Sequence, residues 1–345
     1  MGNNNSRVIN INLDRLEAVY YGSETISGNV SIYTLKDNNV DDTKNTRLEN
    51  VNLILLGEIS YDGEHSNNAG TFSIPVISAK VKLPVIKEKQ EHYCCLFQIN
   101  LDDDYLPPTL NEPYKYPHVR YYLKVIVNDE KSYEKSITIF PIVKILENSL
   151  TSIIYGGNNR KEMEIKGTLN KLGYIPGETI ISKIEIKNPR TILLKYIEIF
   201  LIEYYQIGVG PSHNENILHI VLPGIMNTTN EFISETFSVS IPAYKHLCPS
   251  YEKRDGGRVH VYHVLKIQCK IEGLCSNINI TIPIKLGTEL LQDAYPPSYD
   301  VSEKKQIMRR RKVVDKITGK IFFRQSSVDE VESTKISRRM IDISK

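Results

Sequence analysis

The feature that most constrains this chain is an internal repeat, in which a turn followed by a strand occurs twice. The second copy starts at Gly173-Tyr174-Ile175-Pro176-Gly177-Glu178 and continues as Thr179-Ile180-Ile181-Ser182-Lys183-Ile184-Glu185-Ile186. The first copy is Tyr21-Gly22-Ser23-Glu24-Thr25-Ile26-Ser27-Gly28-Asn29-Val30-Ser31-Ile32. Pro176 presets φ and Gly177 permits the positive φ of a tight turn, while the alternation that follows predicts a strand with one buried face.

Two further blocks follow each copy in the same order. The second block is an apolar strand, at residues 51–56 in the first half and 197–202 in the second. The third block closes each half. Its matching positions are Phe97, Ile99, Leu101 and Pro108 with Phe237, Val239, Ile241 and Pro249, and Val119, Leu123, Lys124 and Val125 with Val261, Leu265, Lys266 and Ile267. Because only loop lengths change between the copies, the sequence predicts two similar β-domains in tandem.

Short apolar stretches separated by polar loops predict that each domain is a β-sandwich. The expected strands of the first half are Arg7–Leu13, Ile26–Leu35, Arg47–Ser60, Thr71–Val76, His92–Leu101, His118–Asn128 and Ser132–Phe140. The expected organisation is a leader at 1–6, an N-terminal domain at 7–141, a connector at 142–162, a C-terminal domain at 163–287 whose strands begin at Met163, and a tail at 288–345.

Charge and cysteine usage narrow the class of protein. The net charge is +2, and 13 Lys and Arg against 9 Asp and Glu lie between Thr288 and Lys345, so the domains have no basic excess for nucleic acid. The five cysteines lack C-x-x-C spacing, which favours a reducing compartment over a zinc site or disulfides. No signal-peptide segment is present, and no apolar run approaches the roughly 18 residues of a spanning helix, so we expect a cytoplasmic protein.

The residues that could carry catalysis are not arranged for it. His260 and His263 are the closest histidine pair, but residues three apart on a strand point to opposite faces and cannot share a metal ion. The chain has no Gly-rich phosphate loop, no G-x-S-x-G and no carboxylate cluster with a partnered histidine. We therefore expect no enzymatic activity, no metal site and no cofactor.

The β pattern stops after Gly287, and the tail opens with Tyr295-Pro296-Pro297-Ser298-Tyr299-Asp300. This is a P-P-x-Y motif. Pro296 and Pro297 would hold the backbone in polyproline II between the aromatic rings of a WW domain, and Tyr299 would fill a second pocket. The alternative is a proline-rich stop after the last strand.

Two features predict contact with a membrane surface. The pattern Met1-Gly2-x-x-x-Ser6 is that of N-myristoylation at Gly2, and the alternative is a polar leader. Between Lys304 and Arg324 the tail holds nine basic residues against one acid, as a partly formed amphipathic helix or a solvated disordered segment would. The basic run begins with Lys304, Lys305, Arg309, Arg310, Arg311 and Lys312.

The paired signatures of the two halves resemble the arrestin-fold family over roughly residues 7–287. The C-terminal half carries the G-Y-x-P-G-E turn and Val259-x-Val261-Tyr262-x-Val264-Leu265-Lys266, and the N-terminal half carries Leu106-Pro107-Pro108-Thr109 and His118-Val119-Arg120-Tyr121-Tyr122-Leu123-Lys124. The resemblance implies an all-β fold of two tandem immunoglobulin-type sandwiches, here followed by a disordered tail.

Within that family the chain looks more like the arrestin-domain-containing group, the α-arrestins. The first strand, Val8-Ile9-Asn10-Ile11-Asn12, lacks the paired lysines with which receptor-desensitising arrestins bind phosphates, and the tail shows no clathrin box. The resemblance implies a trafficking adaptor that recruits a HECT-type ubiquitin ligase to membrane-protein cargo at the plasma membrane or endosomes. The family often carries two P-P-x-Y motifs, whereas this chain has one.

Two other functions remain open from the sequence. The chain could be a structural subunit of a trafficking coat, like the arrestin-fold subunit of retromer, in which the tail motif is incidental. It could also be a membrane-tethered receptor regulator that acts by steric blocking.

Overall fold

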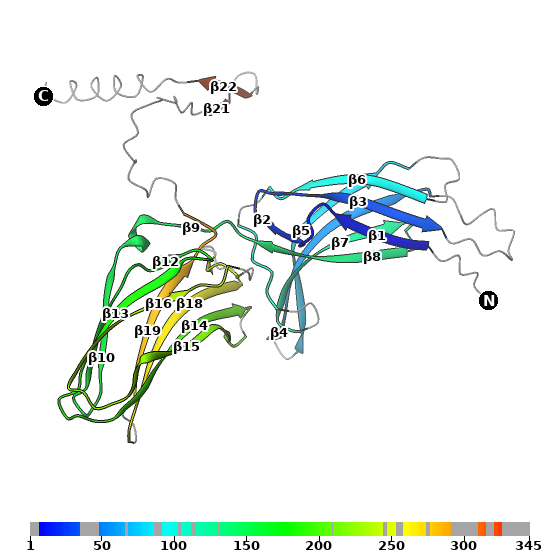
Figure 1. Ribbon diagram of the computed structural model, residues 1–345. Helices are drawn as coiled ribbons and strands as arrows, with labels where there is room; N and C mark the ends of the chain where they lie inside the picture. The colour runs from blue at the N-terminus through cyan, green and yellow to red at the C-terminus, as the bar shows by residue number, and fades with distance from the viewer. Residues whose placement is uncertain are drawn as a thin grey trace, which may run out of the picture. The chain divides into compact units, whose positions relative to one another are not determined.

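The computed structural model describes residues 7–34, 48–65, 68–85, 92–102, 105–111, 115–129, 131–208, 210–243, 247–252, 258–273, 277–290, 310–314 and 321–325. Within these residues the regular structure is β-strand, apart from one turn of 3-10 helix, η1, at Glu147–Leu150. The prediction of an all-β chain is therefore confirmed (Figure 1).

The N-terminal sandwich consists of strands β1 to β8 in two sheets (Figure 1). Its smaller sheet has the order β1 (Arg7–Leu13), β3 (Thr25–Thr34), β6 (His92–Asn100). Its larger sheet has the order β2 (Val19–Tyr21), β8 (Lys131–Phe140), β7 (His118–Val127), β4 (Val51–His65), β5 (Asn68–Leu83).

The C-terminal sandwich consists of strands β10 to β19 and repeats this plan. One sheet has the order β10 (Ile153–Asn158), β11 (Glu164–Leu169), β13 (Thr179–Lys187), β16 (Phe232–Ser240). The other has the order β12 (Gly173–Tyr174), β19 (Ile278–Leu286), β18 (Val259–Ile271), β14 (Leu194–Ile207), β15 (His213–Thr228), and β17 (Tyr251–Glu252) also pairs with β18.

Residue alternation explains why these segments form sandwiches. Along β7 the side chains of Val119, Leu123 and Val125 are fully buried, whereas Arg120 and Lys124 between them are partly exposed. Along β13, Ile180, Ile184 and Ile186 are buried in the same way. Each sheet thus has one apolar face, and facing two such sheets removes both faces from water.

The repeated turn has the same geometry in both halves. The carboxylate of Glu24 accepts a hydrogen bond from the Tyr21 amide at 2.8 Å, and that of Glu178 accepts one from the Ile175 amide at 2.9 Å. The residue before each glutamate has a positive φ, 62° at Ser23 and 90° at Gly177. The repeat predicted from the sequence therefore corresponds to the same backbone turn in both halves of the molecule.

A cation closes each of these turns over a buried tyrosine. The guanidinium of Arg15 contacts Glu24 at 2.7 Å and lies 4.8 Å from the ring centroid of Tyr20. In the second half Lys171 contacts Glu178 at 2.7 Å and lies 5.1 Å from the Tyr174 ring. The hydrogen bond from Arg15 lowers the pKa of Glu24, so this carboxylate is ionised at neutral pH and holds the turn.

The predicted connector needs a correction. Residues 142–162 hold β9 (Lys144–Ile145), η1 and the strand β10, which pairs along its whole length with β11, so the second set of strands begins before Met163. The Gly156-Gly157 pair resembled a loop signal, but these glycines serve close packing. A Cβ at Gly156 would lie 2.8 Å from the Ile165 carbonyl oxygen, and one at Gly157 would lie 3.3 Å from the Ile278 side chain.

Two further strands differ from expectation. β5 extends from Asn68 to Leu83 rather than over residues 71–76, because it pairs with the long strand β4 over this whole range. Pro75 is tolerated within it, since β5 lies at the sheet edge, where a missing N–H costs little. In the tail, which forms a separate unit at Tyr295–Lys345, β21 (Arg310–Val314) pairs antiparallel with β22 (Ile321–Gln325). These residues therefore form strands, and neither the partly formed amphipathic helix nor the solvated disordered segment that the sequence left open describes them.

The C-terminal end of the second sandwich is tied back to the connector. β20 (Glu289–Leu290) runs parallel to β9, and the Val143 amide donates a hydrogen bond to the Thr288 hydroxyl at 2.8 Å. The last described residue of the domains is thus Leu290, a few positions before Tyr295.

Candidate functional site

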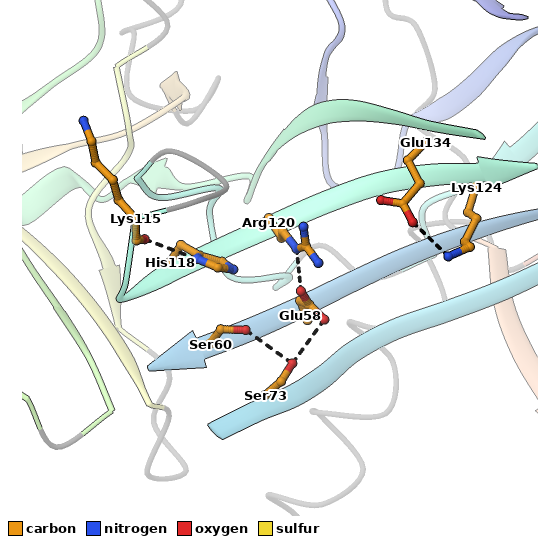
Figure 2. Close-up of polar contacts among 8 residues, drawn as sticks. All are labelled: Glu58, Ser60, Ser73, Lys115, His118, Arg120, Lys124 and Glu134. Atoms are coloured by element: carbon orange, nitrogen blue, oxygen red, sulfur yellow. Dashed lines mark hydrogen bonds and ion pairs between the residues drawn. The ribbon is translucent and has the colours of Figure 1, made fainter. Parts of the chain in front are cut away.

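The outer face of the larger N-terminal sheet carries a line of polar contacts across three strands (Figure 2). Glu58 on β4 lies directly opposite Arg120 on β7, and the two form an ion pair. The hydroxyl of Ser73 on β5 donates to the other oxygen of Glu58 at 3.1 Å, and the Ser60 hydroxyl donates to Ser73 at 3.3 Å. Cross-strand register alone brings these four side chains together.

At one end of this line lies His118, whose side chain is buried. Its Nδ1 lies 3.2 Å from the carbonyl oxygen of Lys115, and Figure 2 shows the imidazole directed away from the Lys115 ammonium. Burial is the largest cause of a lowered His118 pKa, and the positive charge of Arg120 acts in the same direction. The imidazole is therefore neutral at neutral pH, and its hydrogen bond to the carbonyl assigns the proton to Nδ1.

At the other end, Lys124 on β7 donates a hydrogen bond to Glu134 on β8 at 2.8 Å (Figure 2). This bond raises the pKa of Lys124. Besides its ion pair with Glu58, Arg120 also contacts an aromatic ring, since its guanidinium lies 4.7 Å from the centroid of the Tyr122 ring. The face thus presents fixed, paired charges, which suit contact with another protein surface.

Among the described residues, no group of three or more His, Cys, Asp or Glu side chains is placed to hold a metal ion. His263 is fully buried and His260 is only partly buried, in agreement with their expected placement on opposite faces of a strand.

The N-terminal apolar core extends into one end of the C-terminal sandwich, whose own core is a separate cluster of buried side chains. Ile207, Tyr251, Val259 and Val261 of the C-terminal sandwich belong to the same cluster of buried side chains as the N-terminal core. The hydroxyl of Tyr251 also donates to the carbonyl oxygen of Tyr105 at 2.9 Å. This junction buries apolar side chains from both sandwiches, as a fixed domain interface does.

A glycine permits the closest approach at this junction. Gly208 has a φ of 68°, and an ideal Cβ at this position would lie 2.6 Å from a ring carbon of Tyr61. The Tyr61 hydroxyl in turn accepts a hydrogen bond from Arg258 at 2.7 Å. Tyr61 is therefore packed between a backbone turn and a cation of the other sandwich.

Comparison with known families assigns this architecture. Residues 159–291 match the family model described as the C-terminal domain of arrestin (or S-antigen). Residues 159–291 therefore form an arrestin C-terminal domain, which supports an arrestin-fold protein. No curated protein matches the chain.

The arrestin match begins directly after β10 and includes the strands from β11 to β20. The N-terminal sandwich of this arrestin-fold protein lies outside the match, and its sheet order β2-β8-β7-β4-β5 corresponds to the order β12-β19-β18-β14-β15 of the matched domain. The resemblance predicted from the sequence is thus confirmed at the level of the fold family.

The binding residues predicted from motifs are largely beyond what the structure describes. Gly2, Pro296, Pro297, Tyr299, Lys304, Lys305 and Arg309 lie outside the described residues, and Arg310, Arg311 and Lys312 begin β21. Their roles in WW-domain and membrane binding stay predictions. In the part of the chain that the structure describes, no helix is both long and apolar enough to cross a membrane.

Sequence reasoning missed the junction between the arrestin sandwiches. Tyr61 and Gly208 are far apart in the chain, and neither belongs to a motif. One signal was present, since His263 interrupts an inward-facing row of apolar residues on β18, and a buried histidine within such a row needs a polar partner.

Proposed function

We propose that this protein is an arrestin-like trafficking adaptor of the α-arrestin group, which recruits a WW-domain ubiquitin ligase of the HECT type to membrane-protein cargo. The observation that carries the proposal is the position of Pro296, Pro297 and Tyr299, which follow an arrestin C-terminal domain ending at residue 291. The adaptor itself would do no chemistry, because ubiquitin would reach the cargo by proximity of the recruited ligase.

The first strand supports this group over the phosphate-binding arrestins. β1 presents Asn10 and Asn12 between its apolar residues, and the Asn12 amide donates to Asn29 of β3 at 3.0 Å. A strand with these amides and no lysine offers no cationic pair for a receptor phosphate. We therefore place cargo binding on the sandwich faces, of which the paired-charge surface around Glu58 and Arg120 is one candidate.

The test is binding of the full chain to a panel of WW domains, measured by calorimetry. We expect micromolar binding that falls at least tenfold in Tyr299→Ala, because the second WW pocket would then be empty. Tyr295→Ala is the matched control, since it removes the same side chain just outside the motif and should leave affinity unchanged.

Absence of binding by the wild type would overturn the ligase-adaptor proposal and favour a structural coat subunit. The apolar junction between the sandwiches is the observation that suits such a subunit. That function would show itself as a stable stoichiometric complex that is indifferent to Tyr299→Ala.

We also propose that the adaptor is a cytoplasmic protein held at anionic membranes by two signals, an acyl chain on Gly2 and the basic run that begins at Lys304. One myristoyl chain binds membranes only marginally, and each nearby Lys or Arg adds about 1 kcal/mol at an anionic surface. After co-translational acylation, wild type should sediment with phosphatidylserine vesicles and Gly2→Ala should not. Equal partitioning of the two proteins would contradict the two-signal anchor.

A further inference from the structure

A cavity of about 360 Å³ lies where the two sandwiches meet. Asn111 and Phe140 line it from the N-terminal sandwich, and Glu203, Tyr205, Glu215 and Cys248 line it from the C-terminal one. This volume is at the lower end of the range for ligand pockets, so it suits one side chain or a small molecule.

Two carboxylates share the wall of this cavity. Glu203 on β14 is directly opposite Glu215 on β15 in the strand register, and like charges in that position destabilise a sheet. The side chain of Glu203 is only 13% exposed, so water screens its charge weakly. The fold thus maintains an unfavourable pair of negative charges at the edge of a cavity.

These charges affect the pKa values of neighbouring groups. The pKa of Tyr205 is raised first by burial and then by Glu203 and Glu215, while Lys115 acts in the opposite direction. The pKa of the Cys248 thiol is raised by burial and then by Glu203. Glu203 therefore adds to the larger effect of burial at both groups.

A buried histidine lies next to Glu203 but forms no hydrogen bond with its carboxylate. His263 is opposite Glu203 on β18, is fully buried, and has its Nε2 3.5 Å from the Glu203 carboxylate. This Nε2 makes no hydrogen bond within the described structure. Glu203 therefore keeps acceptor capacity toward the cavity.

The proton positions around His263 follow from Ser250. The Leu286 amide donates to the Ser250 hydroxyl at 3.0 Å, and that hydroxyl lies 2.9 Å from Nδ1 of His263. Because Ser250 accepts from the amide, its own proton can be donated to Nδ1, while Nε2 is the ring nitrogen near Glu203.

We propose that this cavity binds the guanidinium of an arginine side chain presented by a partner protein. A planar guanidinium forms paired hydrogen bonds with a carboxylate and stacks on an aromatic ring, and Glu203, Glu215 and Tyr205 supply these partners around one cavity. This site is independent of the P-P-x-Y motif and would add a second protein contact at the sandwich junction.

The test uses N-acetyl-arginine N-methylamide as the probe and the full chain as the receptor, with binding followed by saturation-transfer NMR. We expect saturable millimolar binding by the wild type and at least tenfold weaker binding of the uncharged isostere N-acetyl-citrulline N-methylamide. Glu203→Gln and Glu215→Gln should each weaken binding of the arginine probe at least fivefold. Since Glu215 is exposed, its variant keeps the test valid if Glu203→Gln fails to fold.

Glu198→Gln is the matched control. Glu198 lies on the same strand, its side chain is 15% exposed, and it has its own histidine partner, His219, at 3.1 Å, but it faces the opposite side of the sheet. This variant should bind the probe like wild type. An equal loss in Glu198→Gln, equal binding of the citrulline probe, or no saturable binding by the wild type would each overturn the proposal, and none of these outcomes bears on WW-domain binding.

Discussion

Replacing Leu265 by alanine is expected to lower the free energy of unfolding by about 2–5 kcal/mol, the range for Leu→Ala in a packed core. Leu265 is fully buried at the centre of β18, opposite Leu201 on β14 and Ile282 on β19. Removing its side chain takes apolar surface out of the core and leaves a cavity that flanking strands cannot close. Urea denaturation followed by circular dichroism measures the change.

The internal repeat supplies a partner for this experiment. Leu123 occupies the matching position on β7, is also fully buried, and should show a loss of similar size when changed to alanine. Leu96→Ala is the control, because Leu96 lies on the edge strand β6 with 79% of its surface exposed, and the change should stay within about 0.5 kcal/mol. A small effect at Leu265 would mean that the apolar core of the matched arrestin domain is misassigned.

Gly208→Ala is expected to destabilise the junction between the sandwiches by about 2–5 kcal/mol. An alanine in the left-handed region costs roughly 1–2 kcal/mol, and forcing a methyl group against a packed ring adds about 1–3 kcal/mol. Both terms apply, because φ is 68° and the new Cβ would lie 2.6 Å from Tyr61. The wild-type sandwiches, which bury apolar side chains against each other at the junction, should unfold together, whereas the variant should show two transitions in urea.

Gly210→Ala provides the matched control for the junction. Gly210 is two positions further along the chain, and its ideal Cβ would meet only the Ile207 carbonyl oxygen at an ordinary 3.7 Å. This variant should unfold like wild type. If Gly208→Ala also unfolds in a single transition at the wild-type urea concentration, the contact between Tyr61 and Gly208 does not couple the sandwiches.

Coupling of the sandwiches matters for the proposed adaptor. Cargo bound on a sandwich face and a ligase bound near residue 299 can only be brought together if the domains between them hold a defined geometry. The apolar junction around Tyr251 and the hydrogen bond of Val143 to Thr288 supply that geometry up to Leu290. In the proposed function, the tail would then carry the ligase-binding motif as a covalently attached segment.

Much of the fold was determined by local patterns in the sequence. The alternation along β7 and β13 specified strands with one buried face, and the turn chemistry of Glu24 and Glu178 specified where strands begin. The repeated order of blocks then specified two sandwiches. These features can be predicted from the sequence, because period-two burial and tight turns depend on residues next to one another in the chain.

The tertiary structure alone decided the position of β10, the junction and the cavity. Gly156 and Gly157 look like a loop until Ile165 and Ile278 are packed against them. Glu203 looks like an ordinary strand residue until register sets Glu215 on one side and His263 on the other. Burial, like-charge pairing and close approach are properties of contacts between residues distant in the chain. Local sequence patterns therefore cannot predict them.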